Sequence, residues 1–129
     1  MDWNIYLLVG ISVVALVLLR RRALIPAAKA QTCLRQGALI VDVRTPDEFA
    51  ARHLPKAVNI PLDTLRETLP QQVPDKQQVL LLHCVSGMRS GMAKGIAQTM
   101  GYPNAFNLGS YHRAQSIVQN AAGPIGKKL

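Results

Sequence analysis

The distribution of apolar and polar positions divides the chain into two parts. The run from Trp3 to Leu19 has no charged side chain, whereas short apolar runs alternate with mixed segments from Ala28 onward. The first pattern is typical of a helix that is apolar on every side, and the second of a globular domain. We therefore expect an N-terminal helical segment with a linker over residues 1–27, and one folded domain over residues 28–129.

Four short apolar runs in the domain predict strands that are buried on both faces. They span residues 38–42, 57–60, 78–82 and 105–108. Helices are expected over residues 28–36, 62–69, 87–100 and 111–120, with a further helix that starts at Thr45, and a loop over residues 70–77. Apolar strands that alternate with helices are typical of α/β proteins. The expected fold is therefore α/β, with a central parallel sheet flanked by helices.

The apolar N-terminal run is compatible with a transmembrane helix. A helix over residues 3–19 would rise about 25 Å, slightly less than the roughly 30 Å hydrocarbon core. The side chain of Arg20 can extend to the interface, and local thinning of the bilayer can absorb the remaining mismatch. Trp3 and Tyr6 lie near the other end, where aromatic rings favour the interface. We therefore predict a single membrane anchor at residues 3–19.

The charges that flank this run predict its orientation. Arg20–Arg22 follow the apolar run, whereas Met1-Asp2 has no positive side chain, which disfavours a cleaved signal peptide. The positive-inside rule then predicts a single-pass protein of the inner or plasma membrane, with its N-terminus outside and its domain in the cytoplasm. Two alternatives remain open: an exported protein, and a helix buried in a soluble core.

The charge and cysteine content narrow the classes of ligand. The net charge of +8 fits anionic headgroups or a small anionic substrate. Nucleic acid is not expected as a partner, because the chain has few aromatic residues and no stripe of Lys and Arg interleaved with them. Cys33 and Cys84 form no CxxC or Cys/His ligand spacing, so neither a metal site nor another cofactor is predicted.

The most informative polar segment comes directly after the third predicted strand. Cys84 lies between that strand and the following helix, and Asp42 and Arg44 lie at the same end of the first strand. In open α/β sheets the ligand crevice lies at the carboxyl ends of the strands. A cysteine beside a helix N-terminus has a lowered pKa and forms the reactive thiolate. The alternative is a buried structural cysteine.

The residues after Cys84 are suited to holding an anion. Gly87 permits an unusual backbone dihedral, so the loop can curl and point successive N–H groups inward. Arg89 adds a delocalised positive charge with forked donors. The sequence therefore predicts that an anion binds on or next to Cys84.

Several motifs in order carry a family resemblance. Residues 41–49 (VDVRTPDEF) match the pattern DVR-x-x-x-EF/Y, and residues 53–61 (HLPKAVNIP) are close to G-H-I-x-G-A-x-N-I-P. Residues 84–90 match C-x4-R-[ST], and residues 100–102 (MGY) match the usual exit from the next helix. The chain resembles rhodanese-like domains, especially the small single-domain kind, over about residues 28–124.

The resemblance implies a thiosulfate sulfurtransferase that works without a cofactor. Sulfane sulfur would pass from thiosulfate or a similar small anionic donor to cyanide or a thiol, such as thioredoxin or glutathione, through a persulfide on Cys84. The backbone amides of the loop would stabilise the persulfide, and Arg89 would orient the donor. The loop residues expected to bind substrate are Val85, Ser86, Gly87 and Met88.

Other residues receive more modest roles from the sequence. The resemblance also implies that Asp42 and Arg44 form a pair behind the loop that braces it, with a structural ion pair remote from the substrate as the alternative. His83 is expected to pack at the strand end, and Cys33 to belong to the core. Arg52 and Lys56 occupy positions where the family pattern has glycine, so this turn is expected to differ locally, and Gly109 is the one glycine left of a usual pair.

Two other functions compete with sulfur transfer. Phosphatases and arsenate reductases use related cysteine loops, but a tetrahedral oxyanion needs five residues between Cys and Arg, and here residues 85–88 provide four. A membrane-tethered scaffold with the same fold and no turnover is the second alternative. The presence of Cys84 favours the enzyme.

Overall fold

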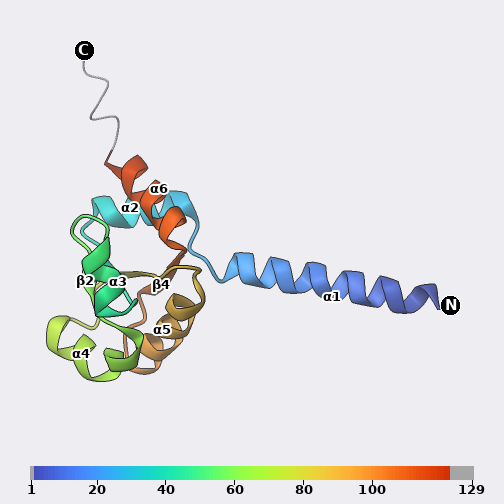
Figure 1. Ribbon diagram of the computed structural model, residues 1–129, viewed down its shortest axis with the longest axis horizontal. Coiled ribbons are helices and arrows are strands. Elements are labelled where there is room, and N and C mark those ends of the chain that lie inside the picture. Colours follow the sequence, from blue (N-terminus) through green and yellow to red (C-terminus); the bar gives the residue numbers. More distant parts are fainter. Residues whose placement is uncertain (1, 123–129) are drawn as a thin grey trace, which may run out of the picture.

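The computed structural model describes residues 2–122, which form one long helix followed by an α/β domain (Figure 1). The side chains of residues 20–22, on which the predicted orientation rests, and residues 123–129, the end of the predicted domain, lie outside the described residues. The helices are α1 (Trp3–Arg22), α2 (Ala27–Arg35), α3 (Pro46–Ala51), α4 (Leu65–Gln72), α5 (Met88–Thr99) and α6 (Tyr111–Ala121), with the 3-10 helix η1 (Leu62–Thr64) before α4. The strands are β1 (Leu39–Asp42), β2 (Val58–Asn59), β3 (Leu80–His83) and β4 (Ala105–Gly109).

The four strands form a parallel sheet with the order β2-β1-β3-β4. In the register of the two central strands, Asp42 at the end of β1 pairs with His83 at the end of β3. The prediction of an α/β domain with a central parallel sheet flanked by helices is therefore confirmed. The register also places the carboxyl ends of β1 and β3 side by side, directly before Arg44 and Cys84.

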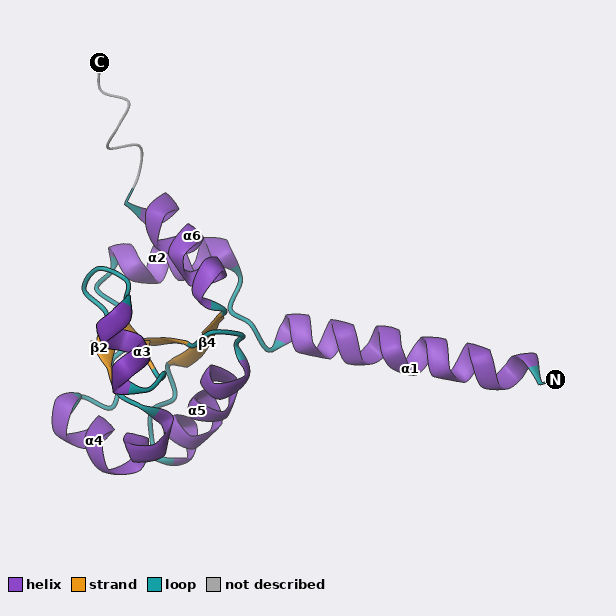
Figure 2. Cartoon of the chain, viewed as in Figure 1, coloured by secondary structure: helices purple, strands orange, loops and turns teal. Residues whose placement is uncertain are grey.

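Helices cover both faces of the sheet, as Figure 2 shows, and each face has its own apolar core. Leu80 and Leu82 of β3 pack on the face that α4 and α5 cover, whereas Leu81 packs on the face of α2 and α6. Because successive strand residues point to opposite faces, a strand between two helical layers is apolar at every position. This requirement explains the unbroken run of leucines in β3.

Helix α3 begins where its sequence predicts, and the cap fixes the chain after β1. The Thr45 hydroxyl accepts a hydrogen bond from the Glu48 amide, while the Glu48 carboxylate accepts one from the Thr45 amide. This reciprocal capping box satisfies two amide groups that a helix terminus leaves without partners, and Pro46 fits the first helical position. The Glu48 side chain is thereby held close to the end of β1.

Helix α4 begins and ends three residues later than the sequence indicates. It includes Pro70 and continues to Gln72, although residues 70–77 were expected to form a loop. Proline removes one helical hydrogen bond, but the buried side chains of Leu65 and Leu69 hold this helix against the sheet. The amide of Val73 closes the helix on the Leu69 carbonyl at 2.8 Å. Tertiary packing here outweighs the local preference of proline.

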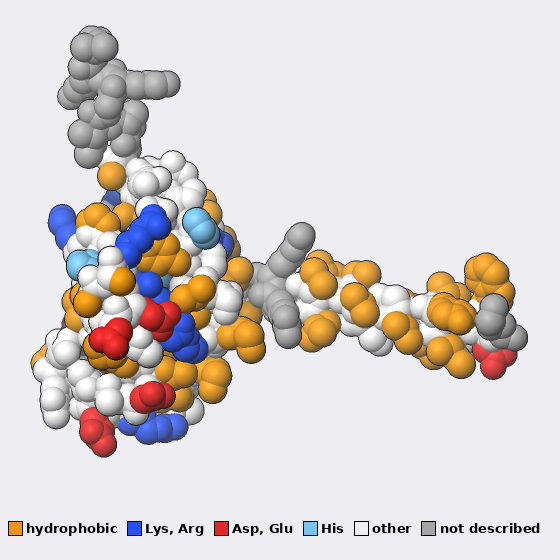
Figure 3. All heavy atoms as spheres, in the orientation of Figure 1, with side chains coloured by type: hydrophobic (Ala, Val, Ile, Leu, Met, Phe, Trp, Pro, Cys, Tyr) orange, Lys and Arg blue, Asp and Glu red, His pale blue; other side chains and the backbone are white. Residues whose placement is uncertain are grey.

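Helix α1 extends away from the domain (Figure 1), and its apolar side chains are exposed (Figure 3). Among the described residues, no helix combines the length and apolar character needed to cross a membrane. The predicted transmembrane anchor at residues 3–19 is therefore not supported. The uncharged run comprises 17 residues, which rise about 25 Å, less than the roughly 30 Å thickness of a hydrocarbon core.

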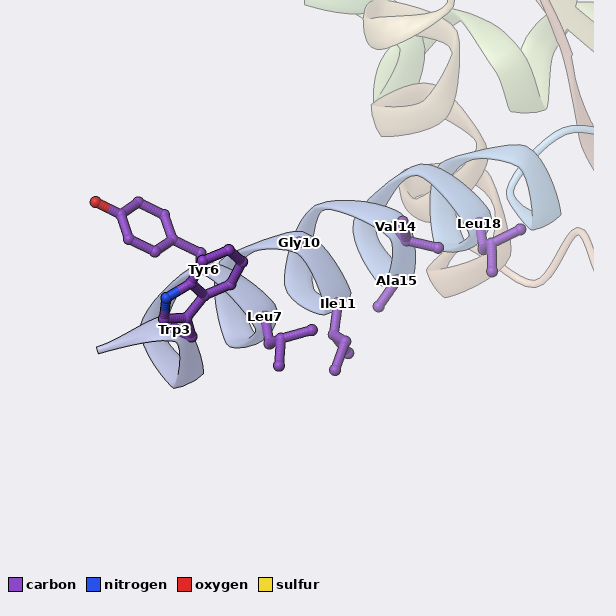
Figure 4. A pocket seen from close by; sticks show the side chains of 8 residues that line it. All are labelled: Trp3, Tyr6, Leu7, Gly10, Ile11, Val14, Ala15 and Leu18. Carbon is purple, nitrogen blue, oxygen red and sulfur yellow. The ribbon is translucent and has the colours of Figure 1, made fainter. Parts of the chain in front are cut away.

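One side of α1 carries an apolar hollow, which Figure 4 shows from close by. The side chains that line it all come from α1 itself: Trp3, Tyr6, Leu7, Gly10, Ile11, Val14, Ala15 and Leu18. It contains no titratable group other than the Tyr6 phenol and no residue of the Cys84 loop. The chemistry that the sequence predicts is therefore located elsewhere, at the carboxyl end of β3.

Candidate active site

The loop after β3 is short and anchored at both ends. The amide of Cys84 donates a hydrogen bond to the Gly109 carbonyl at the end of β4, at 3.2 Å. Gly87 then adopts the left-handed conformation, with φ of 91°, immediately before α5 begins at Met88. A Cβ atom at Gly87 would also approach the Gly109 backbone to 3.4 Å. That contact is an ordinary van der Waals distance, so it is the dihedral that favours glycine at this position, as the sequence predicts.

Hydrogen-bond donors converge on the Cys84 sulfur. The amide of Gly87 lies 3.0 Å from Sγ, and the Ser90 amide and hydroxyl each lie 3.5 Å from it. Burial alone raises the pKa of the Cys84 thiol, but the hydrogen bonds from Ser90 and the amides of Gly87 and Ser86 outweigh burial, so the pKa lies below its usual value. The site thus favours the thiolate, which is the nucleophilic form.

Two further residues, which the sequence did not assign to the site, hold this loop in shape. The Ser90 hydroxyl lies 2.7 Å from Oδ1 of Asn107, which competes with Cys84 Sγ for its single proton, and Nδ2 of Asn107 donates to the Gly87 carbonyl at 3.1 Å. Asn107 lies on β4, so these contacts tie the loop and the start of α5 to the neighbouring strand. Ser90 was visible within the C-x4-R-[ST] motif. The sequence did not indicate Asn107 as a site residue, because its contact with the loop arises only when β4 pairs with β3.

The Arg89 guanidinium forms an ion pair with the Glu48 carboxylate. Its Nη1 and Nη2 atoms donate to the two carboxylate oxygens of Glu48, at 2.7 and 3.1 Å. The hydrogen bond with Arg89 and those with Thr45 lower the pKa of Glu48 to about 2. The pKa of Arg89 is raised in turn, first by Glu48 and further by the negative charge of Cys84. Glu48 is a site residue that the sequence analysis recognised only as part of a motif.

Asp42 and Arg44 form a buried ion pair next to the loop and not within it. The shortest contact joins Nη2 of Arg44 to Oδ2 of Asp42 at 2.6 Å, and the same nitrogen donates to the Arg52 carbonyl. The side-chain nitrogen Nδ2 of Asn59 donates hydrogen bonds to the backbone carbonyls of both Asp42 and Arg44. Among the described residues, Arg44 forms no hydrogen bond with residues 85–89, so it braces the turn after β1.

The remaining residues expected to bind substrate are Val85, Ser86 and Met88, which follow the buried Cys84 in the loop and at the start of α5. Val85 and Met88 are exposed, and so is Met92 one turn further along α5. The hydroxyl of Ser86 accepts a hydrogen bond from the Met88 amide, at 3.4 Å. The side chains of Val85, Met88 and Met92 are therefore exposed apolar surface, whereas Cys84 and Ser90 are buried.

His83 and Cys33 occupy the positions expected of structural residues. His83 is fully buried, its burial lowers its pKa, and both of its ring nitrogens lack a hydrogen-bond partner among the described residues. Its Nε2 atom lies 3.7 Å from the Asp42 carboxylate. Cys33 packs with the core of α2 and α6, on the opposite face of the sheet from the core that contains Cys84. Cys33 is therefore poorly placed to act as a resolving thiol for Cys84.

No group of three or more His, Cys, Asp or Glu side chains in residues 2–122 is arranged to hold a metal ion. The candidate chemistry therefore consists of one activated cysteine, a ring of amide and hydroxyl donors, and a guanidinium paired with a carboxylate.

Comparison with known proteins gives relatives whose names describe sulfur transfer. The chain is 39% identical over 69 residues to thiosulfate sulfurtransferase PspE of Escherichia coli, covering 54% of this chain and 66% of that protein. It is 34% identical over 79 residues to thiosulfate:glutathione sulfurtransferase of Saccharomyces cerevisiae, covering 53% of this chain and 57% of the relative. The chain thus spans less than two thirds of the length of these relatives.

A tRNA uridine(34) hydroxylase of Hamiltonella defensa is also related, with 33% identity over 75 residues. The match covers 55% of this chain and 21% of the hydroxylase. The chain is therefore similar to only a small part of that enzyme.

Solved structures agree with the sequence relatives. An E. coli rhodanese with bound anions has a TM-score of 0.57 and 35% identity, with coverage of 60% of this chain and 91% of that one. The human single-domain sulfurtransferase TSTD1 has a TM-score of 0.63 and 26% identity, with coverage of 73% and 96%. The rhodanese-like domain family itself matches residues 27–115. With its parallel sheet, its cysteine loop and this match over most of its length, the chain belongs to the rhodanese-like domain family.

Proposed function

We propose that this protein is a sulfurtransferase that carries sulfane sulfur as a persulfide on Cys84. The observation that supports this most directly is the Cys84 sulfur itself, which is buried and accepts hydrogen bonds from the Gly87 and Ser90 amides. Such donors stabilise a negative charge on sulfur. The names of the sulfurtransferase relatives point to the same chemistry.

Two displacements account for the transfer. The Cys84 thiolate attacks the sulfane sulfur of thiosulfate, the S–S bond of the donor breaks, and sulfite leaves with the bonding electron pair. Cyanide or a thiolate then attacks the outer sulfur of the Cys84 persulfide. The product is thiocyanate or a new persulfide, and the Cys84 thiolate is restored. No net oxidation occurs, so the cycle requires no redox cofactor.

Each part of the loop has a role in this cycle. The amides that surround Sγ stabilise the thiolate before the first step and the persulfide after it. Three of the five N–H donors of Arg89 remain free of Glu48 and can hydrogen-bond an incoming donor. A protein thiol, such as that of thioredoxin, or glutathione would take the sulfur at the exposed mouth of the site.

The test of the function compares two reactions of the purified chain. We expect thiocyanate to form from thiosulfate and cyanide, and expect negligible hydrolysis of an aryl phosphate, since four residues between Cys84 and Arg89 make a ring too narrow for a tetrahedral oxyanion. Aryl phosphate hydrolysis at a comparable rate would favour a phosphatase or arsenate reductase. If the folded protein has neither activity, a scaffold without turnover would be favoured.

The lowered pKa of Cys84 predicts how turnover depends on pH. Because the thiolate is the nucleophile, kcat/KM for thiosulfate should rise with pH and reach half of its plateau below 9.0, the value from which the hydrogen bonds lower the pKa of this thiol. The same shift stabilises the fold above the unfolded-state pKa, and this contribution is lost as the pH falls through the folded-state pKa.

Ser90→Ala should move this midpoint upward, because the Ser90 hydroxyl is the foremost group that lowers the pKa of Cys84. Thr99→Ala, which removes another hydroxyl of α5, bonded only to the Ile96 carbonyl, serves as the control. A wild-type midpoint at or above 9.0 would contradict the assignment of Cys84 as an activated thiol.

A further inference from the structure

The segment over residues 23–26, which we call the connector because it joins α1 to α2, pairs with the edge strand β4. Leu24 forms a parallel bridge with Asn107, and the Ile25 amide donates a hydrogen bond to the Asn107 carbonyl at 3.0 Å. Figure 2 shows the connector passing the end of β4, where α6 begins. The segment that leads out of α1 therefore contacts the strand that supports the cysteine loop.

The pairing of β4 with β3 is irregular at Leu108. Asn107 and Gly109 pair with successive residues of β3, so Leu108 between them has no partner in that strand. An extra residue in one strand bends that strand and re-aims its side chains, and such bulges are common next to active sites. The Cys84 amide donates its hydrogen bond to the carbonyl of Gly109, directly after the bulge. The bulge therefore sets the place at which the cysteine loop joins β4.

Arg113 of α6 joins this bulge to the connector. Its Nη1 atom donates to the Leu108 carbonyl at 2.6 Å, and its Nη2 atom donates to the Ile25 carbonyl at 2.5 Å. In the described part of the chain, the guanidinium is bonded to these two neutral carbonyls and to no carboxylate. Burial lowers the pKa of Arg113. Removing a cation from water without a counter-charge is costly, so this arrangement indicates a role other than surface charge.

The same part of β4 contacts the groups that surround the Cys84 sulfur. Oδ1 of Asn107 accepts a hydrogen bond from the Gly109 amide at 3.0 Å and lies 2.7 Å from the Ser90 hydroxyl. Nδ2 of Asn107 donates to the Gly87 carbonyl. The amides of Gly87 and Ser90 in turn approach the Cys84 sulfur. Direct contacts thus lead from the connector, through α6 and β4, to the sulfur.

We propose that Arg113 is a positioning residue for Cys84, because it fixes the bulge of β4 against the connector and so holds Asn107 against the cysteine loop. This proposal rests on the sulfur-transfer function above and adds to it a residue outside the sequence motifs of the loop. Without the guanidinium, the Leu108 carbonyl loses the hydrogen bond that holds the bulge in place. The bulge then relaxes, and the donors on Gly87 and Ser90 move away from the sulfur.

The test follows the titration of the Cys84 thiolate by its ultraviolet absorbance, in the full-length chain with Cys33→Ser, and measures kcat/KM for thiosulfate in parallel. Arg113→Lys keeps the positive charge but loses the forked pair of donors. It should move the midpoint of the titration to higher pH and lower kcat/KM at neutral pH about tenfold. Because the charge is kept, the loss of a cation cannot cause this shift. Arg113→Met, which donates no hydrogen bond, should move the midpoint further in the same direction.

Ile117→Val is the control for stability, since it removes one methylene group from the buried face of the same helix. It should lower the melting temperature and leave the midpoint unchanged. The proposal is overturned if both Arg113 variants lower the melting temperature but leave the midpoint in place, because Arg113 would then support only the fold. A shift with Arg113→Met alone would also overturn it, since the lost charge would be the cause. If the wild-type chain transfers no sulfur, the proposed function fails, whereas the thiolate titration still decides the role of Arg113.

Discussion

Cys84→Ser is expected to reduce thiosulfate:cyanide turnover to the background rate, a loss of about a thousandfold or more. The serine hydroxyl can occupy the same ring of amides but cannot form a persulfide. The measurement is thiocyanate formation at saturating thiosulfate, with near-native circular dichroism as evidence that the variant is folded.

Cys33→Ser is the matched control for this variant. Cys33 packs with the core of α2 and α6, on the other face of the sheet from Cys84. We expect its replacement to leave turnover within about twofold of wild type, because surface or half-buried changes of this size rarely perturb a distant site. An inactive Cys33→Ser protein beside an active Cys84→Ser protein would reverse the assignment of the sulfur carrier.

Asp42→Asn is expected to have the largest effect on stability. Asp42 is fully buried and Arg44 is 7% exposed, so the variant leaves the Arg44 charge buried without its partner. Removal of one member of a buried ion pair costs about 3–5 kcal/mol, a large share of the roughly 5–15 kcal/mol by which a domain is stable. The measurement is urea unfolding, which gives the free energy of unfolding and the midpoint.

Asp63→Asn provides the control for this change, because Asp63 is exposed on η1. It should alter the free energy of unfolding by no more than about 0.5 kcal/mol. A loss below about 1 kcal/mol for Asp42→Asn would show that the ion pair contributes little to the fold. The turn after β1 would then be held mainly by the hydrogen bonds of Asn59 to the carbonyls of Asp42 and Arg44.

The strands and the position of the reactive cysteine were predictable because they depend on local features. Leu80–Leu82 must be apolar throughout in a strand covered on both faces, and Cys84 follows at the strand end that faces the ligand crevice. The helix cap at Thr45 was also predictable, because Pro46 and Glu48 follow it at the positions that favour a helix start. In each case residues a few positions apart carry the whole signal.

The features that the sequence did not predict depend on contacts between distant segments. Glu48 and Arg89 are 41 positions apart, and their pairing requires that α3 and α5 begin at the same edge of the sheet. Asn107 supports the loop only once β4 lies beside β3. Local patterns give the chemistry of these side chains, but not their partners.

The backbone conformation of Lys56 was also not predictable from its sequence neighbours. It occupies a position where the family pattern has glycine, and the sequence suggested that the turn would differ there. The structure gives Lys56 a positive φ of 63°, a conformation that costs a non-glycine residue about 1 kcal/mol or more. The chain therefore keeps a left-handed conformation at this position with a residue that disfavours it.

The most direct test of the sulfur-carrier role of Cys84 is the intact mass of the purified protein before and after thiosulfate, without an acceptor. The account predicts that one sulfur atom is added, that peptide mapping places it on Cys84, and that cyanide removes it with formation of an equal amount of thiocyanate. No mass increase in a folded protein, or a sulfur that maps to Cys33, would contradict it.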